Sequence, residues 1–199
     1  MQTNNTLENL IESLKCLPGV GPKSALRLAY YLLQRDRQGA RNLAKSIEES
    51  LSKLGHCKLC NNFSEDDTCK ICDSQDRITD TLCVVEMPTD LLMLEQTHSY
   101  KGMYFILMGR LSPLDGIGPK EIHINKLLER IKQSEINEVI LATNFTTEGN
   151  TTAQYIAELL KETKIKVTRI ARGLPMGGEI EYVDSGTLAQ SLVERKKLI

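Results

Sequence analysis

The sequence predicts a mixed α/β protein in several parts: helices joined by a glycine turn, a four-cysteine metal-binding segment, an α/β unit with a mainly parallel sheet, and a C-terminal helical segment. Three observations lead to this prediction. Two Cys-x-x-Cys pairs lie close together, a Pro-Gly-Val-Gly-Pro turn precedes them, and apolar runs of strand length alternate with helical patterns over residues 82–170. Such alternation favours a parallel sheet, because each crossover between parallel neighbours needs a long connection, usually a helix.

Three helices are predicted in the N-terminal part of the chain. Apolar side chains recur at helical spacing over residues 5–15, 23–33 and 38–54. Asn5 or Thr6 is the expected N-cap of the first helix, because a short polar side chain can accept a hydrogen bond from the free N–H groups of the first turn.

The turn at residues 17–22 is a candidate anion site. Gly19 and Gly21 can adopt backbone angles closed to other residues, so the turn can lie flat against a ligand. The following helix offers free N–H groups and the positive end of its dipole, with Lys23 at its start and Arg27 one turn later on the same face. A phosphate backbone fits this arrangement, and such contacts carry no base sequence. The alternative is a plain connector between two helices.

Four cysteines form two Cys-x-x-Cys pairs separated by eight residues. Two thiolates at this spacing can reach one ion, and two pairs supply the four ligands of a closed tetrahedral zinc site. A site that fills all four positions holds a fold, whereas a catalytic site leaves one position for water. We therefore expect structural zinc at Cys57, Cys60, Cys69 and Cys72.

Disulfides and a redox pair are the alternatives for these cysteines. No secretory signal is visible at the N-terminus, so stable disulfides are not expected. The polar stretch between the pairs is also unlike the strand-helix setting of a redox Cys-x-x-Cys. Cys16 and Cys83 have apolar neighbours in sequence and are expected to be buried. His56 is expected beside the metal site without binding the ion.

The charge distribution separates the hairpin from the cysteine segment. The 199-residue chain has a net charge of −1, but residues 1–56 carry eight basic against five acidic side chains, and residues 57–80 carry three against six. The basic segment suits a DNA-binding face, although solvated helix surfaces produce the same asymmetry. Because the cysteine segment is acidic, we expect its zinc to brace the helices against the α/β unit rather than to contact phosphate. No apolar run approaches the roughly 20 residues of a membrane span, so no membrane association is expected.

The rest of the chain is predicted to alternate strands with helices. The strands are 82–85, 104–107, 138–142 and 166–170, and the helices are 88–94, 121–132, 152–162 and 187–194. Two Gly- and Pro-rich stretches, 112–119 and 172–178, are expected to be functional loops. The apolar-acidic run 179–184 has two interpretations: a nucleotide-site strand, or a turn in which Asp184 caps the last helix.

The acidic side chain after the first strand is a second candidate site. Glu86 would stand at the carboxyl edge of the parallel sheet, where ligand sites gather. Phosphoryl transfer with two magnesium ions needs several carboxylates, and the end of the third strand offers only Asn144 and Glu148. Catalysis is therefore not expected. Glu86 either binds magnesium weakly or caps the start of the neighbouring helix.

These motifs resemble known families. Residues 17–23, followed by Arg27, resemble the helix-hairpin-helix DNA-binding motif. The strand that ends at Glu86 resembles the first strand of a Toprim domain, but the Asp-x-Asp of that module is lacking. The order of hairpin, four cysteines, Toprim-like unit and terminal Gly-Gly-Glu-Ile-Glu-Tyr-Val-Asp resembles the RecR family of bacterial recombination mediators over residues 7–196.

The resemblance implies a non-catalytic DNA-repair scaffold in the cytoplasm, associated with the nucleoid. It implies a homotetrameric ring that acts with RecO and RecF to help RecA load onto single-stranded DNA. Lys23 and Arg27 would line the DNA path, the hairpins and the C-terminal segment would make subunit contacts, and the Toprim-like face would bind partners. The implied parts are a helix-hairpin-helix region (1–55), a zinc finger (56–79), a Toprim-like domain (80–173) and an assembly segment (174–199).

Two other classes of function stay open, and the chain departs from the family at several positions. A magnesium-dependent nuclease or primase-like enzyme would use Glu86 and Glu148, and a metal-stabilised adaptor would bind proteins but no DNA. The family usually has proline where this chain has Phe145 and histidine where it has Arg172. It usually has an acidic residue at the positions of Asn150 and Ser185.

Overall fold

The structure of the protein is a computed structural model that describes residues 6–195 and 197. These residues divide into two compact units, with the boundary between Leu54 and Gly55. No helix in this part of the chain has the length and apolar character needed to cross a membrane. The finer division into four domains stays a prediction.

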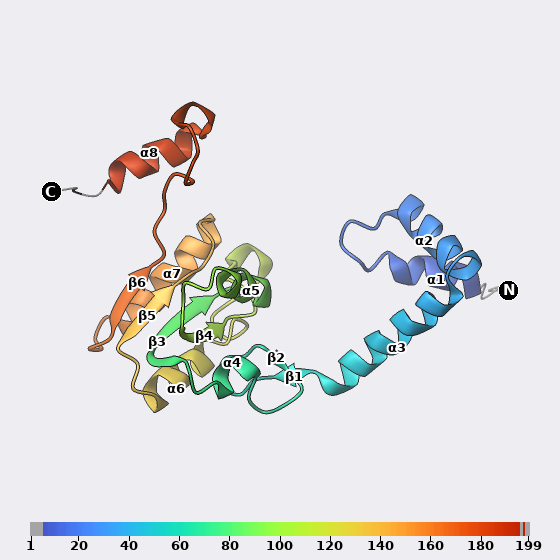
Figure 1. Cartoon of the computed structure of the whole chain (residues 1–199), viewed down its shortest axis with the longest axis horizontal. Helices are drawn as coiled ribbons and strands as arrows, with labels where there is room; N and C mark the ends of the chain where they lie inside the picture. The colour runs from blue at the N-terminus through green and yellow to red at the C-terminus, as the bar shows by residue number, and fades with distance from the viewer. Residues whose placement is uncertain (1–5, 196, 198–199) are drawn as a thin grey trace. The chain divides into compact units, whose positions relative to one another are not determined.

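The first unit is helical and contains α1 (Thr6–Leu14), α2 (Pro22–Gln34) and α3 (Arg37–Lys53), as predicted (Figure 1). Ala25 and Ala29 of α2 are fully buried, and their small side chains let the helices approach closely. Asp36 caps α3, because its Oδ1 accepts a hydrogen bond of 2.7 Å from the Gly39 N–H. Of the two predicted caps of α1, Asn5 lies outside the described residues.

The second unit begins with the cysteine segment and continues into a four-stranded sheet. A two-stranded antiparallel ribbon, β1 (Gly55–His56) with β2 (Phe63–Ser64), precedes the short helix α4 (Lys70–Asp73). The sheet is parallel throughout and has the order β4-β3-β5-β6. Its strands are β3 (Ile78–Val85), β4 (Gly102–Ile106), β5 (Glu138–Leu141) and β6 (Lys166–Arg169).

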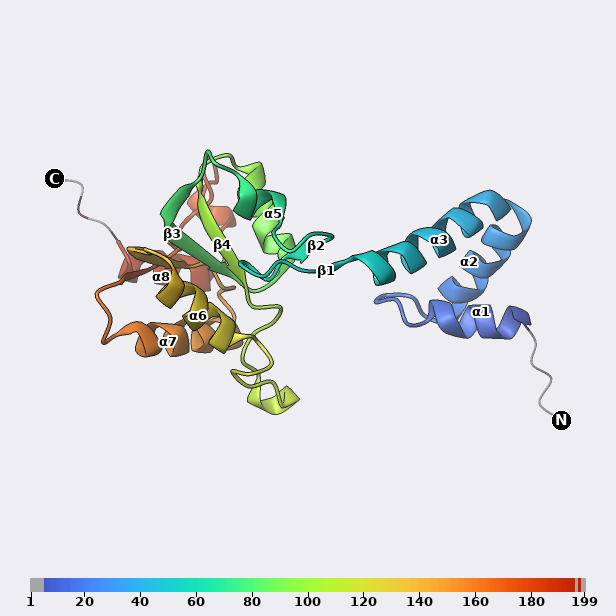
Figure 2. The same cartoon turned by 90° about the horizontal axis from the view of Figure 1, so that it is seen from below.

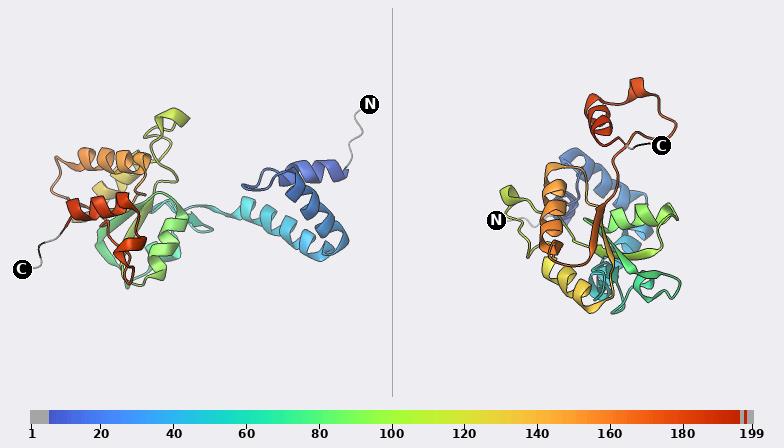
Figure 3. Two further views of the ribbon diagram at one scale, coloured as in Figure 1. Left: turned by 90° about the horizontal axis from the view of Figure 1, so that it is seen from above. Right: turned by 90° about the vertical axis from the view of Figure 1, so that its left-hand side faces the viewer.

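Helices cover both faces of the sheet. In the right-hand view of Figure 3, α6 (Ile124–Gln133) and α7 (Thr147–Leu160) lie on one face and α5 (Pro88–Gln96) on the other. The strand β3 faces both layers: Leu82 and Val84 pack in the α6/α7 core, whereas Cys83 and Val85 pack in the α5 core. This double burial explains why β3 is continuously apolar where it crosses the sheet. It also confirms that Cys83 is buried.

Several predicted boundaries and environments differ from the structure. The helix α7 begins at Thr147, five residues earlier than predicted, because the Thr146 hydroxyl accepts a hydrogen bond of 3.1 Å from the Gly149 N–H. The helix α6 begins later, at Ile124. Cys16 is exposed, so its predicted burial is wrong: it lies in the turn after α1, outside the packed face.

The C-terminal segment decides between the two interpretations of residues 179–184. Residues Ile180–Tyr182 form a 3-10 helix, so the nucleotide-site strand is wrong. The Asp184 carboxylate accepts a hydrogen bond of 2.9 Å from the Thr187 N–H and caps α8 (Ser185–Val193), as predicted. This hydrogen bond lowers the pKa of Asp184.

The Gly- and Pro-rich loop after β4 projects from the sheet domain (Figure 2). It contains the 3-10 turn Pro113–Asp115 and closes on itself through a bridge between Ser112 and Ile117. The side chain of Leu114 at its tip is 99% exposed, so the loop carries an apolar side chain on the protein surface.

Candidate functional site

The glycine turn leaves the N-terminus of α2 open. Gly19 has a φ of +79°, a left-handed conformation that favours glycine, and Gly21 occupies the N-cap position without a capping side chain. A Cβ atom at either glycine would meet no atom of the described residues within 4 Å. The first N–H groups of α2 therefore lack the side-chain acceptor that Ser or Asp would provide, and the space before them is clear.

Two cations stand on the exposed start of the same helix. Lys23 and Arg27 are both exposed, four residues apart on α2. Among the described residues, neither forms an ion pair within 4.0 Å, whereas Lys45 pairs with Glu49 at 3.8 Å. The hairpin therefore combines open N–H donors with two unneutralised charges, the requirement for holding a phosphate.

The four predicted cysteines come together in the second unit. One sulfur from each of Cys57, Cys60, Cys69 and Cys72 lies within 4.8 Å of the other three, and the sulfurs of Cys60 and Cys69 are 3.4 Å apart. A tetrahedral zinc site with bonds of about 2.3 Å needs sulfurs about 3.8 Å apart, so the cluster fits the ion. Within the described part of the chain, no other cluster of three or more His, Cys, Asp or Glu side chains could hold a metal.

The clustered thiols shift one another's pKa values in opposite directions, and hydrogen bonds with Cys60 and Cys72 lower the pKa of Cys69. Hydrogen bonding with Cys69 and Cys72, together with burial, raises the pKa of the Cys60 thiol when no cation is present. A divalent cation at the centre stabilises four thiolates instead, since metal ligands must be deprotonated. The Cys69 N–H donates to the Cys57 sulfur at 3.3 Å and further stabilises its negative charge.

The first cysteine knuckle is attached directly to the sheet. The Ile106 N–H of β4 donates to the Cys60 carbonyl at 2.9 Å, and the Asn61 amide donates back to the Ile106 carbonyl at 2.9 Å. Asn61 is buried and has a φ of +66°, which asparagine tolerates better than most residues. Sequence reasoning missed Asn61, although an asparagine directly after a cysteine knuckle was a usable signal. His56 contacts the Asn61 carbonyl through Nδ1 at 3.1 Å and lies outside the ligand set, as expected.

The buried Glu86 is held by Asn144. One carboxylate oxygen accepts from the Asn144 backbone N–H and the other from its side-chain amide, both at 2.8 Å. Arg110 adds a guanidinium nitrogen 3.9 Å from the second oxygen. The capping interpretation of Glu86 is wrong, because its carboxylate is bonded to Asn144. The backbone N–H of the N-cap residue Met87 is instead satisfied by the Asp90 carboxylate at 2.8 Å.

Glu148 is the third residue that the sequence predicts at this edge of the sheet. Glu148 lies in the first turn of α7, and its backbone carbonyl accepts from the Thr152 hydroxyl at 2.7 Å. Among the described residues, no hydrogen bond joins its carboxylate to Glu86 or to Asn144. Arg110, which sequence reasoning missed, follows the end of β4, where the topology brings it to the same edge of the sheet.

The helix α7 approaches this carboxylate very closely. Gly149 is buried, and a Cβ atom there would overlap the Asn144 carbonyl oxygen and lie 2.6 Å from Glu86 Oε1. Glycine is thus required by the close approach of the helix, not by its backbone angles.

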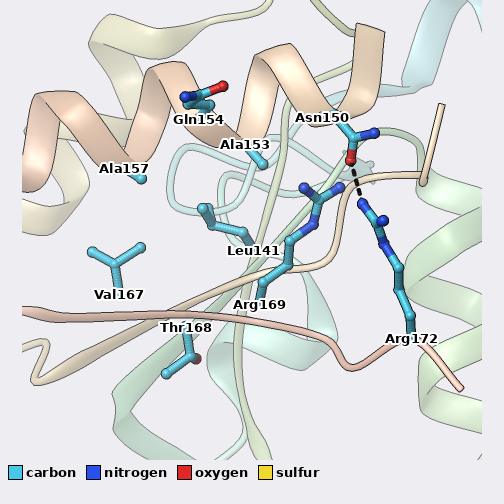
Figure 4. Close-up of a pocket in the computed structure, with 9 residues that line it drawn as sticks. All are labelled: Leu141, Asn150, Ala153, Gln154, Ala157, Val167, Thr168, Arg169 and Arg172. Carbon is cyan, nitrogen blue, oxygen red and sulfur yellow. Dashed lines mark hydrogen bonds between the residues drawn. The ribbon is translucent and has the colours of Figure 1, made fainter. Parts of the chain in front are cut away.

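Three of the positions at which the chain departs from the family pattern lie in one cluster. The guanidinium of Arg172 lies 4.6 Å from the centre of the Phe145 ring. It also donates to Asn150 Oδ1 at 3.1 Å (Figure 4). Arg169 lies 4.7 Å from the same ring. Burial, together with the charge of Arg172, lowers the pKa of Arg169. The cluster places two like charges on one aromatic side chain.

Comparison with known proteins follows the same order of parts. The chain matches family models for the RecR helix-hairpin-helix over residues 7–51, the RecR four-cysteine zinc finger domain over 54–74, the Toprim domain over 80–171 and the RecR C-terminal region over 173–196. It is 55% identical over 196 residues to "Recombination protein RecR" of Chromobacterium violaceum, covering 98% of this chain and 99% of that protein. The chain belongs to the RecR family of recombination proteins.

Proposed function

We propose that the protein is a non-catalytic, DNA-binding recombination mediator that acts with RecO and RecF to help RecA load onto single-stranded DNA. The observation that carries the proposal is the open start of α2, where Gly19 and Gly21 leave the N–H groups free and Lys23 and Arg27 have no acidic partner among the described residues. Contacts from these groups go to phosphates and are independent of base sequence, as a protein that works along a strand requires. We place the protein in the cytoplasm, associated with the nucleoid.

A ring-forming homotetramer is part of this proposal. Large apolar side chains on α2 and α3 are exposed in the single chain, which supports contacts with other copies. These side chains are Leu26, Leu28, Tyr30, Tyr31, Leu33, Leu43, Ile47 and Leu51. A ring would bring several hairpins together and turn a weakly basic segment into a multivalent DNA surface.

Replacing both hairpin cations tests DNA binding. We expect Lys23→Ala with Arg27→Ala to weaken binding to a single-stranded oligonucleotide about tenfold or more, and to reduce the slope of log K against log [salt] by about 1.4. The melting temperature should stay unchanged, because both side chains are exposed. Fluorescence anisotropy over a series of salt concentrations measures the affinity and its salt dependence.

A control with the same loss of charge is Arg41→Ala with Lys45→Ala on α3, where both side chains are exposed. It should change affinity far less than the hairpin variant. Equal effects of the two double variants would show that the hairpin holds no particular phosphate site.

The partners of the Glu86 carboxylate support the non-catalytic part of the proposal. Both carboxylate oxygens are engaged by Asn144, and Arg110 supplies a cation nearby, so a magnesium ion would have to displace groups that the fold already provides. We expect magnesium to leave the melting temperature unchanged. Asn144→Asp should lower it by placing two carboxylates together, and magnesium should then restore part of the loss. Magnesium-dependent cleavage or synthesis that disappears in Glu86→Gln would favour the enzyme alternative.

A mobility-shift assay on single- and double-stranded DNA, with and without RecO, separates the three classes of function. A mediator shifts DNA alone or with the partner without altering it. An enzyme changes the length of the DNA when magnesium is added. An adaptor shifts DNA in neither condition.

A further inference from the structure

A groove of about 430 Å³ runs between α7 and β6 (Figure 4). Its lining includes four aliphatic side chains of α7, β5 and β6: Leu141 and Ala153, which are buried in the core, and Ala157 and Val167, which are partly buried. Polar groups gather toward one end, where Asn150 lies near the start of α7 and Arg169 ends β6. The groove therefore has an apolar body and a cationic end.

The strand that borders the groove is an edge of the sheet. Among the strands of the described residues, β6 pairs with β5 alone. The Lys166 N–H donates to Asn137 and the Ile170 N–H to Leu141, so these main-chain groups point toward β5. Because main-chain groups alternate along a strand, those of Val167 and Arg169 point away from β5. An edge of this kind can pair with an extended peptide.

The charges at the end of the groove are poorly compensated. Among the described residues, the only carboxylate within 4.0 Å of the Arg169 or Arg172 guanidinium is that of Glu194, at 3.9 Å from Arg172. The Nε atom of Arg169 is buried and has no hydrogen-bond partner among the described residues, whereas Nη2 of the same side chain donates to the Asn144 carbonyl at 3.3 Å. The N-terminus of α7 adds the positive end of its dipole at the same place. This end of the groove is therefore suited to an anion.

We propose that the groove binds the carboxyl end of a partner protein as an extended peptide whose last side chain is apolar. The terminal carboxylate contacts Arg169 and Arg172, the last side chain fills the aliphatic part of the groove, and the peptide main chain pairs with β6. Since the cations lie at the C-terminal end of β6, the peptide runs parallel to this strand. Capture of carboxyl termini and addition of a strand to a sheet edge are both established modes of peptide recognition.

The lining favours a peptide over a nucleic acid. A single-stranded nucleic acid needs a row of cations along its backbone and aromatic surfaces for its bases. Here the cations stand at one end, and no aromatic side chain is among the described residues that line the groove. One anionic group next to one apolar group fits the observed distribution. The inference is independent of the hairpin, which concerns another unit of the chain.

The test uses immobilised hexapeptides with randomised residues before a final Leu, prepared with a free carboxyl end and with an amidated end. We expect the full-length protein to be retained at least about tenfold better by the free carboxyl pool. Arg172→Gln should abolish this difference, and Ala157→Leu should reduce retention by filling the groove without changing charge. Lys166→Gln is the matched control, because this exposed cation also lies on β6 but contacts Glu138, outside the groove lining.

Four outcomes would overturn the inference. Equal retention by the two pools, or no retention by either, would show that no terminal carboxylate is recognised. An equal effect of Lys166→Gln and Arg172→Gln would show general charge attraction. Loss of single-stranded oligonucleotide binding in Arg172→Gln, without any effect on peptides, would assign the cations to DNA. A failure here leaves the Lys23 and Arg27 experiment unaffected, so the two proposals fail separately.

Discussion

Cys57→Ala is expected to abolish stoichiometric zinc binding and to lower the melting temperature by about 10 °C or more. Structural zinc contributes folding free energy directly, and a site with three thiolates binds the ion far more weakly than one with four. A loss of about 3–4 kcal/mol in the free energy of unfolding lowers the melting temperature by about 10 °C in a domain of this size. Elemental analysis and calorimetry measure the two effects.

The damage should extend beyond the cysteine segment. Because the Cys60 carbonyl and the Asn61 amide are both bonded to Ile106, loss of the metal releases two hydrogen bonds at β4. Ile71 and Cys72 also pack against the two cores of the sheet domain and would be loosened. Hydrogen exchange should therefore increase along β4 as well as in the knuckles. Zinc should also be lost on acidification, since protons compete for the thiolates.

Cys16→Ala is the control for this experiment. It removes a thiol that is exposed and lies outside the metal cluster, so zinc content and melting temperature should stay unchanged. Freshly purified protein without zinc, or a Cys57→Ala variant as stable as the parent protein, would contradict the assignment.

Gly149→Ala is expected to destabilise the protein by about 3 kcal/mol, within the range for overpacked cores. Helix propensity alone predicts the opposite sign, a gain of about 1 kcal/mol from alanine inside a helix. The close approach decides the result, because the new Cβ atom would overlap the Asn144 carbonyl oxygen. α7 would have to move away from β5, and the Glu86 contacts with Asn144 would be lost. Chemical denaturation measures the change.

Gly173→Ala provides the comparison within the same unit. Within the described part of the chain its Cβ atom would meet nothing within 4 Å, and its φ lies outside the left-handed region, so the change should be within about 0.5 kcal/mol. A Gly149→Ala variant that is more stable than the parent would show that α7 can shift without cost. The inference that the close approach of α7 to Glu86 requires glycine at position 149 would then be wrong.

The sequence alone determined the parts whose signals are local. The spacing of Cys57, Cys60, Cys69 and Cys72 identified the ligands, because a knuckle is closed by a few neighbouring residues. The apolar run that ends at Val85 identified a strand buried on both faces, and Asp184 identified its helix cap. The order of these motifs also identified the family, as the match to the relative from Chromobacterium violaceum confirms.

Only the tertiary structure decided which contacts form between segments that are far apart in the sequence. Glu86 could have bound a metal or capped α5, and its partner proved to be Asn144, 58 residues later, with Arg110 beside it. Exposure of Cys16 and the pairing of Arg169 with Arg172 around Phe145 were likewise invisible in the local pattern. The physical reason is that spacing along the chain specifies helices, strands and knuckles, whereas contacts across a sheet edge depend on how loops and helices pack against it.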